Sequence, residues 1–189
     1  LFMKYDRIDS KLFIKNRKNF MDKMKPKSLA VFNSNDIYPI GADSTMPFQQ
    51  NRDLFYLSGV DQDESILVLF PDAPEEKHRE ILFLTETNEH IAVWEGAKLT
   101  KEEAFKTSGV CEVYWLSEMK EKLDDLISKC DGIYLNKNMH SRSTSEVQTR
   151  DDRFRNMVIE KYNKEILESA PLMHELRSIK SDAEISLLQ

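Results

Sequence analysis

The chain has 189 residues, a formal net charge of −6 and a hydrophobic fraction of 40%. This length can bury one substantial core, and the acidic balance without a basic run argues against a nucleic-acid partner. No apolar segment approaches the ~20 residues of a membrane span, and the charged N-terminal residues predict no signal peptide. The two cysteines, Cys111 and Cys130, lack metal-site spacing. Reduced cysteines and a cytoplasmic location are therefore expected.

The first third of the chain predicts a helix followed by a strand. Asp9 or Ser10 can cap a helix that runs to about Met24, because apolar residues recur there at helical spacing. Pro26 ends this helix, and Ser28–Phe32 is predicted to be a strand.

The middle of the chain predicts a series of short strands. The apolar runs Leu54–Leu57 and Ile66–Phe70 flank Gly59 and the polar turn Asp61–Glu64, a pattern typical of two strands joined by a loop. Further apolar runs predict strands at Glu80–Leu84, Ile91–Trp94, Val113–Leu116 and Ile133–Leu135.

The predicted helices of the second half have recognisable start signals. Thr100 and Glu103 form a capping box, and Gly109 is a suitable residue for the end of the short helix that follows. Ser117 is expected to cap a second helix, and a long third helix is predicted from about Ser145 to Glu168. Continuously apolar strands are typically covered on both faces. The predicted fold class is therefore α/β, a mixed sheet of about six strands with helices on both faces.

Three stretches resemble a known family. Between Gly41 and Asp72 the order is ADS, PF-x-QN-x-D, FYL-x-G, an acidic turn and an apolar strand. This order resembles the N-terminal domain of Xaa-Pro aminopeptidase (aminopeptidase P), in the creatinase/prolidase group. The segment IAVWEGAKLT at 91–100 is similar to that family's tryptophan-bearing loop, and MHELRSIKS at 173–181 is similar to its linker into the catalytic domain. The resemblance implies a creatinase N-terminal-domain-like fold.

The resemblance also implies a domain division. Residues 1–168 would be the N-terminal α/β domain, and residues 169–189 the linker and the start of an absent catalytic domain. Ser181 and Glu184 form a capping box that opens a helix stopping at Gln189. We therefore expect the chain to be part of a longer protein, and this helix to be poorly ordered or docked on a partner.

No catalytic motif is found in the sequence. The four histidines are scattered, and His174-Glu175 lacks the second histidine of H-E-x-x-H. The acidic runs Asp61–Glu64 and Asp151-Asp152 are interpreted as solvated turns or helix faces. The family's two divalent metal ions, expected to be manganese, are held by carboxylates and a histidine of the catalytic domain. The chain alone is therefore expected to bind no catalytic metal and to cleave no peptide.

A small set of residues remains as candidates for function. From the residues alone, Asp43 is a turn residue and Trp94 a packing residue. The resemblance instead implies that both lie at the rim of a neighbouring subunit's substrate cleft. The segment Trp94-Glu95-Gly96-Ala97-Lys98 departs from the W-x-G-R-R of many bacterial relatives. Structural or linker roles are expected for Asn51, Asp53, Arg177 and Lys180.

Three hypotheses for the parent protein remain open. The first is a metallopeptidase that removes the N-terminal residue preceding proline, acting as a homodimer or tetramer on peptides with proline at the second position. The second is a prolidase-type dipeptidase limited to Xaa-Pro dipeptides. The third is a peptidase-like protein that has lost its metal ligands and only binds partners. All three share this N-terminal domain.

Overall fold

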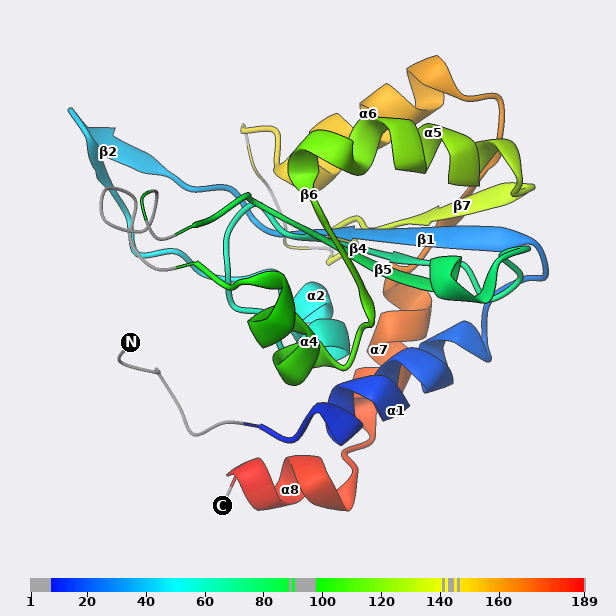
Figure 1. The fold of residues 1–189 in the computed structure, drawn as a ribbon, viewed down its shortest axis with the longest axis horizontal. Coiled ribbons are helices and arrows are strands. Elements are labelled where there is room, and N and C mark those ends of the chain that lie inside the picture. The colour runs from blue at the N-terminus through cyan, green and yellow to red at the C-terminus, as the bar shows by residue number, and fades with distance from the viewer. Residues whose placement is uncertain are drawn as a thin grey trace.

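The computed structural model describes residues 8–88, 90, 98–140, 142, 145 and 147–188. Its centre is a six-stranded sheet in the order β6-β5-β4-β1-β7-β8 (Figure 1). The pairs β1–β4 and β4–β5 are antiparallel, and the other three pairs are parallel. The strands are β1 (Ser28–Asn33), β4 (Ile66–Leu69), β5 (Glu80–Leu84), β6 (Glu112–Trp115), β7 (Gly132–Leu135) and β8 (Glu165–Glu168).

Helices cover both faces of the sheet. The strand side chains on one face of the sheet form a core with α1, α2, α4 and α7. Those on the other face form a second core with α5 and α6 (Figure 1). This confirms the predicted α/β class and the mixed sheet. The helical segments are α1 (Ser10–Met21), α2 (Arg52–Ser58), η1 (Glu76–His78), α4 (Lys101–Ser108), η2 (Leu116–Glu118), α5 (Met119–Ser128), α6 (Arg150–Lys161), α7 (Ala170–Ser178) and α8 (Asp182–Leu188).

The two cores explain why the interior positions of the central strands are apolar. Successive side chains of a strand point to opposite faces of the sheet. In β1, Ala30 and Phe32 lie in the core beneath α1 and α2, whereas Leu29 and Val31 lie in the core beneath α5 and α6. Every residue of β1 is buried, and its two polar residues, Ser28 and Asn33, stand at its ends.

The strand predicted at Leu54–Leu57 is wrong, because these residues belong to the helix α2. The Asn51 side chain accepts hydrogen bonds from the amides of Asp53 (3.0 Å) and Leu54 (3.3 Å), which caps the helix. Gly59 ends it with a φ of 68°, in the left-handed region. The caps at both ends outweigh the strand preference of an aromatic and apolar run.

The long helix predicted from Ser145 to Glu168 is wrong in its second half. The helix α6 begins after Thr149, which forms a capping box with Asp152, and it ends at Lys161. Residues 165–168 instead form the edge strand β8, which pairs in parallel with β7. The chain then turns into α7, where Pro171 lies in the first turn, a position that tolerates proline.

Two other start signals have different outcomes. The capping box of Thr100 and Glu103 and the end of α4 at Gly109 are confirmed. Ser117 caps no helix, because it lies inside the single 3₁₀ turn η2 that precedes α5. The strand predicted at Ile91–Trp94 lies outside the described residues. None of the helices in the described part of the chain has the length and apolar character needed to cross a membrane.

The last two helices differ in how they pack. Met173 of α7 is fully buried in the same core as α1 and α2. The capping box of Ser181 and Glu184 opens α8 as predicted. None of the α8 residues is buried, and the helix lies beyond α1 on the side away from the sheet (Figure 1). The division at residue 168 and the order of this last segment stay predictions.

Candidate functional site

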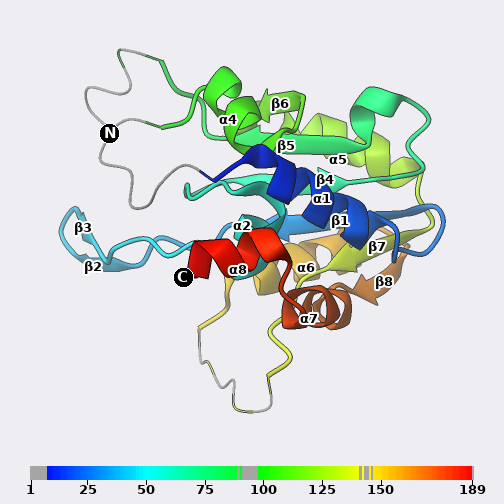
Figure 2. The ribbon, with the colours of Figure 1, turned by 90° about the horizontal axis from the view of Figure 1, so that it is seen from below.

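Among the helices and strands that the structure describes, the small hairpin carrying Asp43 is exposed at every strand residue. Its strands are β2 (Pro39–Gly41) and β3 (Ser44–Thr45), and it extends away from the sheet and helices (Figures 1 and 2). Ala42 makes the turn with a φ of 49°, and Asp43 is exposed beside it. The hairpin therefore presents a carboxylate beyond the body of the domain.

The hairpin also exposes apolar side chains next to this carboxylate. Ile40 is 65% exposed and Met46 is 54% exposed, and Ile37 and Tyr38 on the outgoing arm are also exposed. Grouped exposed apolar residues on a projecting element are typical of a surface that contacts another macromolecule.

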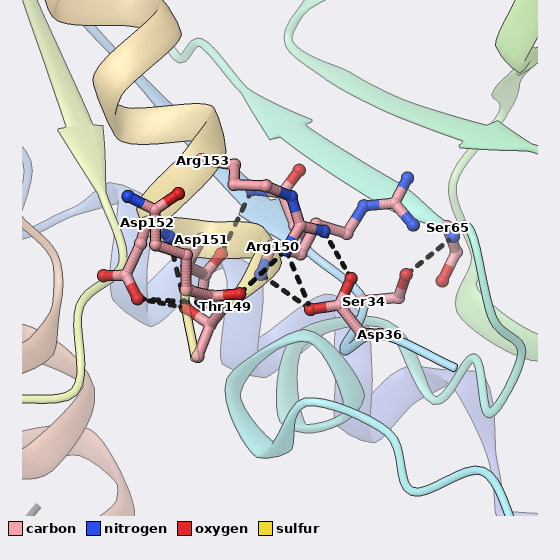
Figure 3. A network of polar contacts seen from close by, with 10 residues as sticks. Ser34, Asp36, Ser65, Thr149, Arg150, Asp151, Asp152 and Arg153 are labelled. Carbon is pink, nitrogen blue, oxygen red and sulfur yellow. Dashed lines mark hydrogen bonds and ion pairs between the residues drawn. The ribbon is translucent and has the colours of Figure 1, made fainter. Parts of the chain in front are cut away.

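The outgoing arm of the hairpin is held by the N-terminus of α6. The Asp36 carboxylate accepts a hydrogen bond from the Arg150 amide (2.9 Å) and forms an ion pair with Arg153, whose Nη2 lies 2.5 Å from Oδ1 (Figure 3). A carboxylate at the N-terminus of a helix interacts favourably with the helix dipole. Sequence reasoning missed this pair, because its partners are 117 residues apart.

A second carboxylate in this region, that of Asp151 in the first turn of α6, has the most strongly shifted pKa there. Its two oxygens accept from the side-chain amides of Asn33 (3.1 Å) and Asn51 (3.3 Å). Burial raises the pKa of the Asp151 carboxyl to about 7, and the Asp53 and Asp152 carboxylates act in the same direction. The Asn33 hydrogen bond and the charge of Arg150 oppose the shift. The prediction that Asp151 is a solvated residue is therefore wrong.

Because of the Asp151 carboxyl, we expect the free energy of unfolding to fall as the pH rises from about 4 to about 7. Asp151 titrates near 3.8 in an unfolded chain and near 7 in the fold. Between these values the folded state keeps this proton while the unfolded state has released it, so each rise in pH favours the unfolded state. The contribution should reach about 1.4 kcal/mol per pH unit. Urea unfolding at a series of pH values measures it. An Asp151→Asn variant should lack this contribution, and an unchanged slope in that variant would contradict the assignment.

Three of the residues predicted to have structural or linker roles, Asp53, Arg177 and Lys180, are connected by an ion pair and a hydrogen bond. Arg177 of α7 forms an ion pair of 2.6 Å with Asp53 in the first turn of α2. Lys180 donates to the carbonyl of Arg177, and the Tyr56 hydroxyl donates to the carbonyl of Leu176 (3.4 Å). These bonds tie α2 to the segment that leads into α8.

A cavity of about 510 Å³ lies beside this linker, between α1, α2 and α8. Its lining is mainly apolar, with Phe13 and Phe55 on one side and Leu187 and Leu188 on the other. Its charged lining residues are of both signs: Arg52, Arg177, Lys180, Asp61 and Glu184. The structure thus brings Asn51, Asp53, Arg177 and Lys180 to one region around α2, whereas Asp43 lies apart on the hairpin. Trp94 lies outside the described residues.

Within the described ranges, no group of three or more histidine, cysteine or acidic side chains could hold a metal ion. No nucleophile and base pair is built among the contacts of the hairpin and the α6 N-terminus. The chemistry that this region offers is recognition through a carboxylate and apolar contacts.

Comparisons with known proteins give a consistent result. Residues 13–134 match the family model described as the aminopeptidase P N-terminal domain. The Xaa-Pro aminopeptidase of Escherichia coli (strain K12) is 25% identical over 179 residues, which is 94% of this chain and 40% of that protein.

Solved structures agree. A Bacillus anthracis protein described provisionally as an aminopeptidase P superimposes with a TM-score of 0.82 at 26% identity, over 95% of this chain and 42% of that one. A zinc-substituted aminopeptidase P from E. coli in complex with product superimposes with a TM-score of 0.77 at 26% identity, over 97% of this chain and 42% of that one. The chain spans about two fifths of the length of these relatives.

Proposed function

Because the chain belongs to the family of aminopeptidase P N-terminal domains, we propose that it is the non-catalytic N-terminal domain of a metal-dependent Xaa-Pro aminopeptidase. The observation that carries this proposal is the family match over residues 13–134, together with relatives named Xaa-Pro aminopeptidase that align along 94% of the chain. The proposed reaction removes the N-terminal residue that precedes proline. The proposed parent is a cytoplasmic homodimer or tetramer.

The chemical step is assigned to the part of the parent that lies outside this chain. Two divalent metal ions, proposed to be manganese, would be held there by carboxylates and a histidine. Support comes from the zinc-substituted relative, which is a metal-containing aminopeptidase P. The described residues of this chain offer no comparable group of ligands, so the chain by itself is proposed to be inactive.

The domain is proposed to contribute to oligomerisation and to the substrate cleft of a neighbouring subunit. Asp43 stands at the tip of the hairpin, with exposed apolar side chains beside it. A carboxylate there can attract the ammonium group at the N-terminus of a peptide substrate. Trp94 is proposed to lie at the same rim, where an indole face can pack against a proline ring. Neither residue would contact the metals.

The test uses the full-length enzyme and a peptide with proline at the second position. Asp43→Ala should raise KM several-fold, because it removes a charge that attracts the substrate but takes no part in the metal chemistry. Metal content, measured on the same preparations, should be unchanged. Glu121→Ala is a suitable control, since this exposed acidic residue lies in α5, on the other face of the sheet from α2 and away from the hairpin.

Other outcomes would favour other functions. Turnover of Xaa-Pro dipeptides without turnover of longer peptides would identify a prolidase-type dipeptidase. A parent without bound metal and without turnover would be a binding protein. An Asp43→Ala enzyme with wild-type KM would contradict the rim assignment while leaving the family unaffected.

A further inference from the structure

We propose that the first turn of α6 is a clamp that positions the β2–β3 hairpin, with Arg153 as the positioning residue for Asp43. The clamp consists of the Arg150 amide, the Asp151 carboxylate and the Arg153 guanidinium. The proposal rests on the proposed function, because it concerns how Asp43 reaches the substrate of a neighbouring subunit.

The need for a clamp follows from the exposure of the hairpin. All residues of β2 and β3 are exposed, as are Ala42 and Asp43 between them. Core packing therefore cannot set the direction in which the hairpin points. Its two strands are joined by few contacts, among them the hydrogen bond from the Met46 amide to the Tyr38 carbonyl (2.8 Å). The direction of the hairpin must be set where its arms leave the domain.

The outgoing arm is held at two points by α6. At the end of β1, the Asn33 side-chain amide donates to Asp151 (3.1 Å). Three residues later, the Asp36 carboxylate accepts hydrogen bonds from the Arg150 backbone amide and the Arg153 guanidinium (Figure 3). Nη1 of Arg153 also donates to the Gln148 carbonyl (2.8 Å). This second hydrogen bond restrains the orientation of the guanidinium that contacts Asp36.

The return arm is held by the same turn. Asn51 donates from its side-chain amide to the second oxygen of Asp151 (3.3 Å), while its own oxygen caps α2. The two arms are also joined to each other, because the Asn35 side-chain amide donates to the Gln49 backbone carbonyl (3.0 Å). Both arms therefore contact one turn of α6, while Ser34 and Gln50 also hold their bases to the loop before β4. Asp36 is the hairpin-side residue nearest the tip that α6 holds.

Arg153 is the member of the clamp that can be removed most selectively. Its side chain is 51% exposed, so it contributes little to core packing. The chain also offers a matched control in Arg155, which lies on the same helix and forms a similar two-point ion pair with Glu168 of β8 (2.5 and 3.1 Å). Arg155→Gln removes an ion pair whose arginine is more buried, at 18% exposure, without touching the hairpin, so it is a stringent control.

The first measurement is hydrogen exchange in the full-length enzyme. In Arg153→Gln, the Met46 amide should exchange about five-fold faster, because a partly exposed ion pair no longer holds the outgoing arm. Arg155→Gln should leave this amide at its wild-type rate. Equal rates in the wild type and Arg153→Gln would overturn the clamp.

The second measurement is a kinetic cycle with Asp43→Ala. Arg153→Gln should raise KM about five-fold with little change in kcat, and it should raise KM no further in the Asp43→Ala background. Asp36→Asn should behave like Arg153→Gln, whereas Arg155→Gln should not alter KM. A merely structural role would give additive effects, so additivity overturns the proposal.

The two proposals fail in distinguishable ways. If Asp43→Ala alone leaves KM unchanged, the rim function is wrong and Arg153 has no substrate-directed role. If Asp43→Ala raises KM but Arg153→Gln does not, the rim function stands and the positioning role is overturned.

Discussion

Replacing Arg17 with methionine should lower the free energy of unfolding by about 2–4 kcal/mol. Arg17 lies on the buried face of α1 and is fully buried. Its Nη1 donates to the carbonyls of Leu57 (2.8 Å) and Ser108 (2.9 Å), and its Nε donates to the Glu80 carboxylate (2.9 Å). One side chain thus satisfies three acceptors from three different elements.

The expected loss follows from what these acceptors are. Leu57 lies in the last turn of α2 and Ser108 is the last residue of α4, so both carbonyls lie at the negative ends of helix dipoles. Methionine keeps much of the apolar stem but offers no donor. Each buried carbonyl left without a partner costs about 1–3 kcal/mol. Glu80, which is partly exposed, would lose its ion pair as well.

Urea unfolding of the isolated chain measures this loss, with Lys18→Met as the control. Lys18 is the next residue of α1, its side chain is 69% exposed, and its ion pair with Asp22 lies on the surface. Its replacement should change the unfolding free energy by no more than about 0.5 kcal/mol. A loss below about 1 kcal/mol for Arg17→Met would show that the buried guanidinium is not what joins α1 to α2 and α4.

The elements that the sequence predicts correctly are those whose signals lie within a few neighbouring residues. The strands β4 and β5 are short apolar runs, and α4 lies between a capping box and a glycine. The misassigned parts depend on distant partners. Residues 165–168 become a strand only because β7 offers a free edge about 30 residues earlier in the chain. The run at Leu54–Leu57 becomes helical because its caps and its contacts with α1 decide between two conformations that the run itself allows.

The candidate site likewise has one residue that a local motif predicts and supporting contacts that depend on distant residues. Asp43 could be named from a motif, because the order ADS and PF-x-QN-x-D is contiguous in sequence. Its supporting contacts could not, because Asp36 and Arg153 meet only when α6 is placed beside the end of β1. The prediction for Asp151 fails for a similar reason. Two adjacent aspartates are usually solvated, but here the amides of Asn33 and Asn51 enclose one of them.

Replacing Gly59 with alanine is expected to cost about 2–4 kcal/mol, through two separate effects. Gly59 ends α2 with a φ of 68°, where a side chain adds strain of about 1–2 kcal/mol. A Cβ at this position would also lie 2.3 Å from the ring of Phe13, which packs on the end of α2 from α1. The ring is buried and borders the cavity between α1, α2 and α8, so relieving the overlap requires it to leave its present contacts and turn toward that cavity.

Two other glycines separate strain from steric overlap. Gly109 ends α4 with a φ of 75°, but the nearest atom to its Cβ would be the terminal carbon of Ile14 at 2.6 Å. Ile14 is 43% exposed and can change rotamer. Gly41 lies in the hairpin, where an added Cβ would have no atom within 4 Å. Gly59→Ala should therefore cost most, Gly109→Ala about 1–2 kcal/mol, and Gly41→Ala less than about 0.5 kcal/mol. Equal losses at Gly59 and Gly109 would mean that backbone strain alone sets the cost and that the Phe13 contact relaxes freely.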